Sequence, residues 1–274
     1  MAWRFAEASS VGGRAEQQDR ADVFSANGAH LAIVADGMGG HENGAAAAQA
    51  VIDIAHERFI ASDAPEPRDF LDSICLAAHD AIKTLPNSGG LSAGSTCVLF
   101  YANGPEAYWI HVGDTRLYYF NEGKLLSRTR DHSLVQAMLD QGEIPEEEAV
   151  GHPMRNQIYM RLGGDKQPEP TFDCLALEDS AVFLLCTDGF WEMVEPEEAA
   201  ATLASTDSLD DAVHELIDRA NERGGSDGDN ISLLVAEWSE GQQLGVPTTN
   251  ADSRSNGALG WKRIIRRAKS TFGV

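Results

Sequence analysis

The spacing of the apolar runs is the feature that most constrains how this chain can fold. The middle runs follow one another at the short distance that hairpins require, and Asn121-Glu122-Gly123 supplies turn residues. Strands joined by hairpins pair antiparallel, so the sequence predicts largely antiparallel sheets. The runs with strand character occupy positions 31–36, 95–102, 107–114, 116–126, 181–188 and 230–238.

Helical periodicity lies between these runs. Two long helices are expected before the central strands, and a second helical pair is expected at about 196–205 and 208–222, before the last strand. This order favours helices packed outside stacked sheets over alternating βαβ units. We therefore expect an α+β fold, a four-layer α-β-β-α sandwich of two stacked, mainly antiparallel sheets flanked by helix pairs. The apolar stripes of the first pair are Val51, Ile54, Ala55 and Phe59, then Phe70, Ile74, Ala77, Ala78, Ala81 and Leu85.

The composition changes near the C-terminal end of the chain. Residues 1–240 contain no linker and no repeat, so one domain is expected there. Positions 241–260 are polar and rich in Gly, Ser, Thr and Asn, which predicts a flexible linker. Residues 261–274 carry five Lys and Arg side chains opposite hydrophobic residues at helical spacing. Such a tail is typical of docking to a membrane surface or a protein partner, and folding back onto the acidic domain is the alternative.

Acidic residues dominate the charge of the chain. There are 43 Asp and Glu against 21 Lys and Arg, a formal charge of -22, which disfavours nucleic acid as a partner. The four cysteines have no CxxC spacing and mostly lie in apolar runs, so reduced core cysteines are favoured over zinc ligands or disulfides. The sequence has no recognisable signal peptide or membrane span. A cytoplasmic location is expected, and docking of the tail could place the protein at the inner membrane surface.

Acidic residues beside glycine stand at the ends of several apolar runs. Asp36, Asp188 and Asp229 share this arrangement, and Asp114 in "IHVGDTR" is a fourth case. Each alone also fits an ordinary turn. Brought together, such carboxylates would repel and raise one another's pKa unless cations lay between them, which indicates a site for two or more divalent ions. Oxygen ligands suit Mg²⁺ or Mn²⁺. Neither nucleotide-binding loop pattern, G-x-x-x-x-G-K-[ST] or G-x-G-x-x-G, is present.

Eight short motifs in order resemble the PPM-type (type 2C) metal-dependent serine/threonine protein phosphatases, most closely their bacterial branch. The resemblance covers roughly residues 8–238. Each motif alone is weak, whereas the set in family order is a strong signal. The motifs are "GGRAEQQDR" (12–20), "VADGMGGHENG" (34–44), "GSTCVLF" (94–100), "HVGDTRLYYF" (111–120), "RDHS" (130–133), "HPMRNQIYMRLGG" (152–164), "LLCTDGFWE" (184–192) and "DNISLL" (229–234).

The resemblance implies a metal role for the acidic motif residues. Asp36 would bridge two ions, with the Gly37 carbonyl on the second ion. Asp188 and Asp229 would bind the first ion. A third, weaker ion would use Asp114 and Glu192.

The resemblance also implies roles beyond the metal ligands. Arg14 would bind the substrate phosphate, since a guanidinium fork matches phosphate oxygens. Asp19 resembles the acid that holds metal-bound water. Segment 133–164 resembles the family's variable flap, where Arg155 and its neighbour Asn156 would help to position a phosphopeptide.

Two departures from the family pattern concern proton transfer and the water network. The first motif reads Gln17-Gln18-Asp19, where members usually have an asparagine before the acid. Met38 stands where animal members have a histidine assigned as the general acid, and methionine has no proton to give. Bacterial relatives commonly share this methionine, so activity is still expected.

These features together predict a Mn²⁺- or Mg²⁺-dependent phosphatase that hydrolyses phosphoserine and phosphothreonine by attack of a metal-bridged water or hydroxide. The expected partners are phosphoprotein substrates, a bacterial Ser/Thr kinase and its targets among them, and no Cys-x5-Arg loop is present for a covalent phosphoenzyme. The alternative is a non-catalytic, phosphatase-like regulator that binds phosphoproteins. A third possibility is the same chemistry on another substrate, such as an anti-sigma-factor antagonist phosphoprotein.

Overall fold

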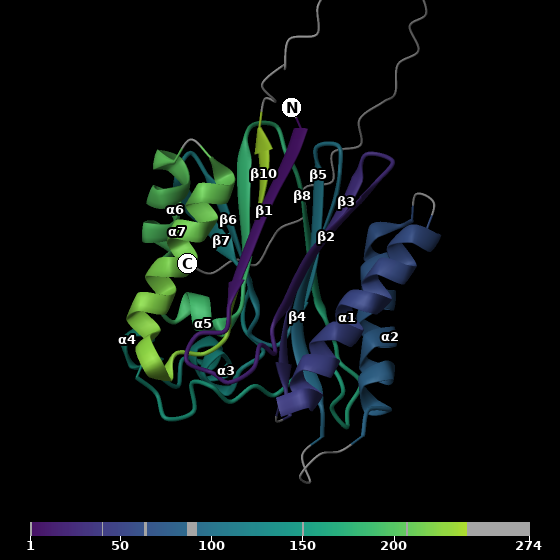
Figure 1. Cartoon of the computed structure of the whole chain (residues 1–274), viewed down its shortest axis with the longest axis vertical. Helices are drawn as coiled ribbons and strands as arrows, with labels where there is room; N and C mark the ends of the chain where they lie inside the picture. The colour runs from purple at the N-terminus through teal and green to yellow at the C-terminus, as the bar shows by residue number, and fades with distance from the viewer. Residues whose placement is uncertain are drawn as a thin grey trace, which may run out of the picture.

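Two five-stranded sheets stack face to face in the computed structural model, which describes residues 2–39, 41–62, 65–86, 92–149, 151–206 and 208–239 (Figure 1). Every pair of neighbouring strands is antiparallel. The first sheet has the order β1 (Ala2–Ser10), β10 (Ile231–Ser239), β9 (Ala181–Cys186), β6 (Arg116–Asn121), β7 (Lys124–Arg128). The second has the order β2 (Arg20–Ala26), β3 (Ala29–Met38), β4 (Gly94–Asn103), β5 (Glu106–Val112), β8 (Thr171–Ala176).

A helix pair covers the outer face of each sheet (Figure 1). Helices α1 (His41–Ala61) and α2 (Pro67–Lys83) pack on the second sheet, while α6 (Pro196–Ser205) and α7 (Leu209–Gly224) pack on the first. The predicted four-layer α-β-β-α sandwich is confirmed. Three short helices and a 3-10 turn lie in the connections: α3 (Leu134–Gln141), α4 (Glu146–Ala149), α5 (Asp188–Trp191) and Gly225–Asp227.

Three apolar layers hold these four layers together. One lies between α1, α2 and the second sheet, one between the two sheets, and one between the first sheet and α6 and α7. In the middle layer the Phe183 ring is fully buried, with the rings of Phe100 and Tyr119 4.8 and 4.9 Å away between centroids. Burial of large aromatic side chains on both inner faces fixes the stacking of the sheets.

The structure adds elements that the sequence patterns did not predict. Strands β1, β2 and β8 were missed, and each is an edge strand of its sheet. The predicted run 116–126 is two strands, β6 and β7, joined at Glu122 and Gly123, both with positive φ. The flap segment 133–164 contains α3 and α4, and an irregular stretch that makes single β-bridges to Ser95 and Ser133.

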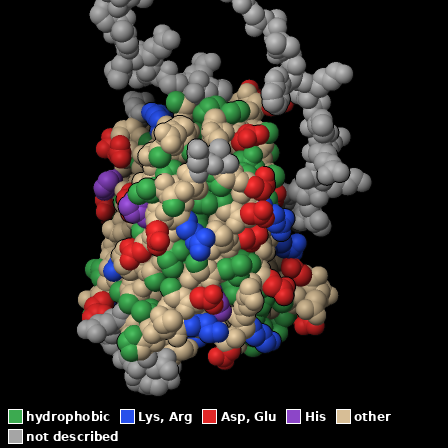
Figure 2. Space-filling view, turned by 90° about the vertical axis from the view of Figure 1, so that its right-hand side faces the viewer, with side chains coloured by type: hydrophobic (Ala, Val, Ile, Leu, Met, Phe, Trp, Pro, Cys, Tyr) green, Lys and Arg blue, Asp and Glu red, His purple; other side chains and the backbone are tan. Residues whose placement is uncertain are grey.

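The surface over α1 and α2 carries acidic and basic side chains interspersed with hydrophobic and neutral ones (Figure 2). Among the described residues, no helix is both long and apolar enough to span a bilayer. The predicted linker 241–260 and basic tail 261–274 lie outside the described residues.

Candidate active site

Several of the predicted site residues line one cavity of about 520 Å³. It lies where β3 and β9 end and the loop before β10 arrives, on the side of the molecule where α5 and the start of α1 are found (Figure 1). Four carboxylates that are far apart in sequence therefore face one space. The predicted residues that line the cavity are Arg14, Asp36, Gly37, Asp114, Asp188 and Asp229.

Asp36 is held by the central pairing of the second sheet. It lies opposite Thr96 in the β3–β4 register, and its carbonyl accepts a hydrogen bond from Ser95 Oγ at 2.9 Å. The next residue, Gly37, has no room for a side chain: a Cβ there would lie 2.0 Å from the Gly44 carbonyl oxygen. Glycine at this position lets α1 begin directly against the strand end that carries Asp36.

Asp19 lies behind the cavity and does not line it. Its side chain is buried, and its Oδ2 accepts a hydrogen bond from Thr187 Oγ1 at 2.8 Å. Thr187 Oγ1 in turn accepts from the Ser232 backbone N–H at 3.0 Å. Because Thr187 precedes Asp188, this chain of contacts joins Asp19 to the backbone that presents Asp188.

Asn230 fixes the loop that carries Arg14. Its Nδ2 donates to the carbonyls of Val11 (2.9 Å) and Glu16 (3.0 Å), and its Oδ1 accepts from the Gln18 N–H (2.8 Å). The sequence reasoning missed this role. The only signal was its position directly after Asp229, which says nothing about a loop more than 200 residues earlier.

Arg14 is exposed and reaches the cavity by an ion pair. Its Nη2 donates to Asp229 Oδ2 at 2.8 Å. The other Asp229 oxygen, Oδ1, accepts from the Asn230 N–H at 2.8 Å. Both oxygens of Asp229 are therefore engaged with donors of the protein itself.

The electrostatics of the cluster oppose ionisation of its members. Burial raises the pKa of Asp36 and Asp188 well above the ordinary value, and neighbouring carboxylates raise it further, Asp188 acting on Asp36 and Asp114 on Asp188. Burial is also the main cause that raises the pKa of Asp19 to about 7 and that of Asp114 to about 6. Cations between the carboxylates would remove this repulsion.

The donor atoms suit hard divalent cations. They are carboxylate oxygens and the Gly37 carbonyl, the donor types that Mg²⁺ and Mn²⁺ take, with no cysteine or histidine lining the cavity. In the described part of the chain, no three His, Cys, Asp or Glu side chains already stand in a geometry that would hold a metal ion. The residue types fit the ions.

Glu192 and Arg155 lie in a neighbouring cavity of about 520 Å³, which α3, α4 and α5 help to line. Arg155 Nε is 3.8 Å from Glu192 Oε1, and both side chains are partly exposed. The structure therefore does not bring Arg155 into the carboxylate cavity. Glu192 lies near enough for its charge to raise the pKa of Asp188 and Asp114.

Trp191 links the two predicted ligands of a third ion. Its Nε1 donates to the Asp114 carbonyl at 3.0 Å, and Glu192 follows it in the chain. The guanidinium of Arg116 stacks over the Trp191 ring at 3.5 Å and forms two hydrogen bonds, of 2.9 and 2.7 Å, with Asp131. These contacts fix the backbone at Asp114, and the sequence reasoning did not predict them.

The flap contributes to the carboxylate cavity through Asn156, which was predicted to help position a phosphopeptide, and through Ile158, which was not predicted. Ile158 is held in place by its bridge to Ser133. Met38 also lines the cavity, so the position where a histidine stands in animal members of the resembled family lies at the site itself.

Similarity to known proteins covers most of the chain. Residues 9–227 match the family described as Protein phosphatase 2C. A putative protein phosphatase 2C-type of Streptococcus pyogenes serotype M6 is 33% identical over 229 residues, which cover 82% of this chain and 93% of that protein. The serine/threonine protein phosphatase PstP of Mycobacterium tuberculosis is 34% identical over 266 residues, covering 88% of this chain, and the chain spans about half of its length (49%).

A solved structure extends the likeness to three dimensions. The catalytic domain of serine threonine protein phosphatase PstP, in complex with two manganese ions, superposes with a TM-score of 0.73 and 30% identity, covering 87% of this chain and 99% of that one. The matched segment includes Asp36, Asp114 and Asp188 and ends two residues before Asp229. The chain belongs to the protein phosphatase 2C family.

Proposed function

We propose that this chain is a protein serine/threonine phosphatase that hydrolyses phosphoserine and phosphothreonine in a metal-dependent reaction. The observation that carries the proposal is the convergence of Asp36, Asp114, Asp188 and Asp229 on one cavity with Arg14 at its edge. The names of the relatives and the manganese ions in the PstP structure support the same reaction and the need for a metal.

Asp36, the Gly37 carbonyl, Asp188 and Asp229 would hold two ions, and Asp114 with Glu192 would hold a third. Ions bound there would supply an activated water and neutralise charge on the phosphoryl group. Oxygen donors support Mn²⁺ or Mg²⁺ equally. The distribution of acids supports the third position: Asp114 lines the cavity, and Glu192 lies beside it.

Arg14 binds the phosphate in this proposal. Its guanidinium now pairs with Asp229, so a cation that takes the Asp229 oxygens would free the fork of Arg14 for the phosphate oxygens. Asp19 is the candidate to hold the attacking water, because Thr187 joins its buried carboxylate to the backbone that presents Asp188. Met38 donates no proton, so protonation of the leaving oxygen needs another source.

Arg155 is proposed to contact substrate residues beside the phosphorylated one. It lies on the flap, and its ion pair with Glu192 is long and partly exposed, so a substrate carboxylate would compete with Glu192 at little cost. The physiological substrates are proposed to include a Ser/Thr kinase and its targets, and the tail 261–274 is proposed to dock to a membrane surface or a partner.

A non-catalytic regulator is the second candidate. Its mark would be the loss of a bridging carboxylate, whereas Asp36, Asp188 and Asp229 are all present and share one cavity. Phosphopeptide binding without turnover in the presence of Mn²⁺ would favour this candidate.

Hydrolysis of p-nitrophenyl phosphate and of a phosphothreonine peptide tests the proposal. We expect turnover with Mn²⁺ and none in EDTA, and we expect Asp36→Ala and Asp188→Ala each to lower kcat by about 100-fold or more, since each removes a metal ligand. Asp179→Ala, an exposed acid before β9, at the opposite end of that strand from Asp188, is the matched control and should retain activity. Circular dichroism checks that each variant is folded, and Mn²⁺ binding by electron paramagnetic resonance should weaken in the two site variants alone. Full activity in EDTA would overturn the mechanism.

A further inference from the structure

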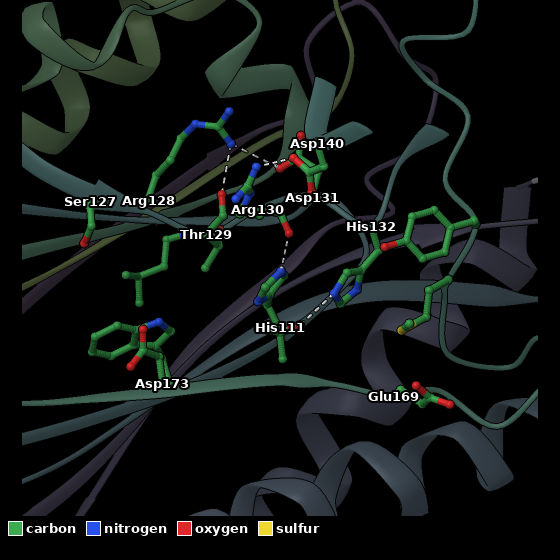
Figure 3. Close-up of a pocket in the computed structure, with 15 residues that line it drawn as sticks. His111, Ser127, Arg128, Thr129, Arg130, Asp131, His132, Asp140, Glu169 and Asp173 are labelled. Carbon is green, nitrogen blue, oxygen red and sulfur yellow. Dashed lines mark hydrogen bonds and ion pairs between the residues drawn. The ribbon is translucent and has the colours of Figure 1, made fainter. Parts of the chain in front are cut away.

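A second cavity, of about 410 Å³, shares no lining residue with the carboxylate cavity (Figure 3). Its walls come from strands β5, β6, β7 and β8, the segment 129–132 that follows β7, the flap with α3, and the loop that carries Glu169. Its size is in the range of small-molecule sites. The phosphatase reaction proposed above uses none of these residues.

A pair of stacked imidazoles forms the centre of this cavity. The rings of His111 and His132 lie 4.6 Å apart between centroids, at an interplanar angle of 17°. His132 is satisfied at both nitrogens: Nδ1 accepts from the Gly113 N–H at 3.1 Å, and Nε2 bonds to Thr171 Oγ1 at 2.9 Å. Burial lowers the pKa of His132 to about 3, so this ring is neutral.

His111 is satisfied at only one nitrogen. Its Nε2 lies 2.8 Å from the Arg130 carbonyl, which only accepts, so Nε2 carries the proton. Burial lowers the pKa of His111 against smaller opposing effects of the Arg130 and Thr171 backbones and Asp131, which keeps the ring neutral. Nδ1 is then an acceptor. The side chain is 1% exposed, and within the described chain Nδ1 has no hydrogen-bond partner. An unsatisfied buried acceptor is costly, and a ligand that donates a hydrogen would remove the cost.

The unmatched charge around His111 is negative. Arg130 forms an ion pair with Asp140, while Arg128 donates to the Thr129 carbonyl and lies 3.7 Å from Asp131. Two acids have no such counterpart. Asp173, one oxygen of which accepts from the Cys174 N–H, and Glu169 form no ion pair with any described residue. Figure 3 places these two acids on either side of His111.

We propose that this cavity binds a linear organic cation with two or more ammonium or guanidinium groups, of the polyamine class. Its outer cationic groups pair with Asp173 and Glu169, and an N–H between them donates to His111 Nδ1. Its methylene groups and charges pack against the aromatic faces of Trp109 and Tyr159, where cation–π attraction adds to the burial of apolar surface. The cavity is larger than one basic side chain needs, which favours a small molecule over a residue of a protein partner.

Calorimetric titration of the full chain with spermidine tests this proposal, with 1,8-octanediol as an uncharged molecule of similar length. We expect saturable binding of spermidine near physiological salt and none of the diol. The double variant Asp173→Asn, Glu169→Gln should raise the Kd by about tenfold or more, because both ionic contacts are lost. In ¹⁵N-labelled protein, spermidine should shift the His111 Nδ1 resonance and leave that of His132 Nδ1 nearly unchanged.

The control must separate this site from general attraction to an acidic chain of formal charge -22. Glu57→Gln with Asp179→Asn removes the same charge at exposed positions outside the cavity, and it should leave the Kd within about twofold. Equal Kd values in the two double variants would overturn the proposal, since the binding would then be nonspecific. A lysine-containing peptide that binds more tightly than spermidine would overturn the assignment to a small ligand.

Discussion

Asp36 occupies the position where the charges of this molecule are most crowded. Burial raises the pKa of Asp36, and the charges of four other carboxylates, those of Asp188, Asp19, Asp114 and Asp229, raise it further. Asp19 also forms a hydrogen bond with Asp36. A cation beside the Asp36 carboxylate would lower the free energy of its ionised form, which burial and the neighbouring charges disfavour. The residue therefore links the stability of the folded chain to the presence of a divalent cation.

The pH dependence of stability should report this link through Asp19. Its pKa is raised from 3.8 to about 7 in the fold, so the folded chain binds this proton more tightly than the unfolded chain does. The stabilisation is present below pH 3.8 and is lost as pH rises through about 7. In EDTA, the melting temperature of the chain minus that of Asp19→Asn should therefore fall between about pH 4 and pH 7.

Mn²⁺ should flatten that trend, because a bound cation favours the ionised carboxylates and so lowers the pKa of Asp19 in the folded chain. The measurement is thermal unfolding followed by circular dichroism, with and without the ion. A difference that stays constant with pH in EDTA would contradict the raised pKa of Asp19. Asparagine retains an oxygen that accepts from Thr187, so the comparison isolates the charge.

The sequence predicted the carboxylates of the site better than their supports. Asp36 and Asp188 each follow an apolar run, a pattern visible in the sequence, and they line the cavity as expected. Asn230 acts through three contacts to a loop at the other end of the chain, and no local pattern encodes such contacts. Arg155 lies in the adjacent cavity. The sequence could not predict this position, because the flap has little regular structure from which the direction of the side chain could be inferred.

Helix α5 is only one turn long, yet it carries both a carboxylate of the cavity, Asp188, and a tryptophan that contacts Arg116 and Asp114. It begins with Asp188 and ends with Trp191, whose ring lies under Arg116 and whose N–H holds the Asp114 carbonyl. A displacement of this turn would move the ligands of two proposed ions together.

Replacing Trp191 with phenylalanine should weaken this connection. The variant keeps an aromatic ring under Arg116 and loses the 3.0 Å hydrogen bond to Asp114, so stability should fall by about 1 kcal/mol. The Mn²⁺ concentration for half-maximal activity should rise a few-fold, and Mn²⁺ binding measured by calorimetry should weaken in step.

Trp238 provides a matched control for that substitution. It is also largely buried, but its Nε1 has no hydrogen-bond partner among the described residues. Trp238→Phe should leave Mn²⁺ binding unchanged. Equal losses of metal affinity in both variants would contradict a positioning role for Trp191.

The elements that the sequence did not predict share a physical property. Strands β1, β2 and β8 lie at sheet edges, where one side of the strand has no neighbour and fewer side chains are buried. β4, a central strand, is buried at nine of its ten positions and was predicted. Apolar periodicity records burial, so it predicts central strands well and edge strands poorly.

At the scale of the whole molecule, the distribution of charge along the chain is uneven. The acidic residues are concentrated before position 253, whereas residues 261–274 carry five basic side chains and no acidic one. The full-length chain should therefore co-sediment with vesicles of anionic phospholipid, and a chain ending at residue 240 should not. Binding should fall as salt is added, because the attraction is electrostatic.

A full-length variant with Lys262, Arg263, Arg266 and Arg267 changed to glutamine controls for the removal of the tail. It should lose vesicle binding to the same extent as the truncated chain while it retains phosphatase activity. Equal sedimentation of all three proteins would exclude docking of the tail to membranes.

One short stretch of the flap borders both cavities. Asn156 and Ile158 line the carboxylate cavity, while Tyr159 and Met160 line the cavity around His111, and the Tyr159 N–H donates to the His132 carbonyl at 2.9 Å. A shared wall of this kind lets binding on one side affect binding on the other, and any such coupling is reciprocal by thermodynamic linkage. If a bound polyamine changes the affinity for a phosphoprotein by some factor, the phosphoprotein changes the affinity for the polyamine by the same factor. Either ligand can therefore be used to detect binding of the other.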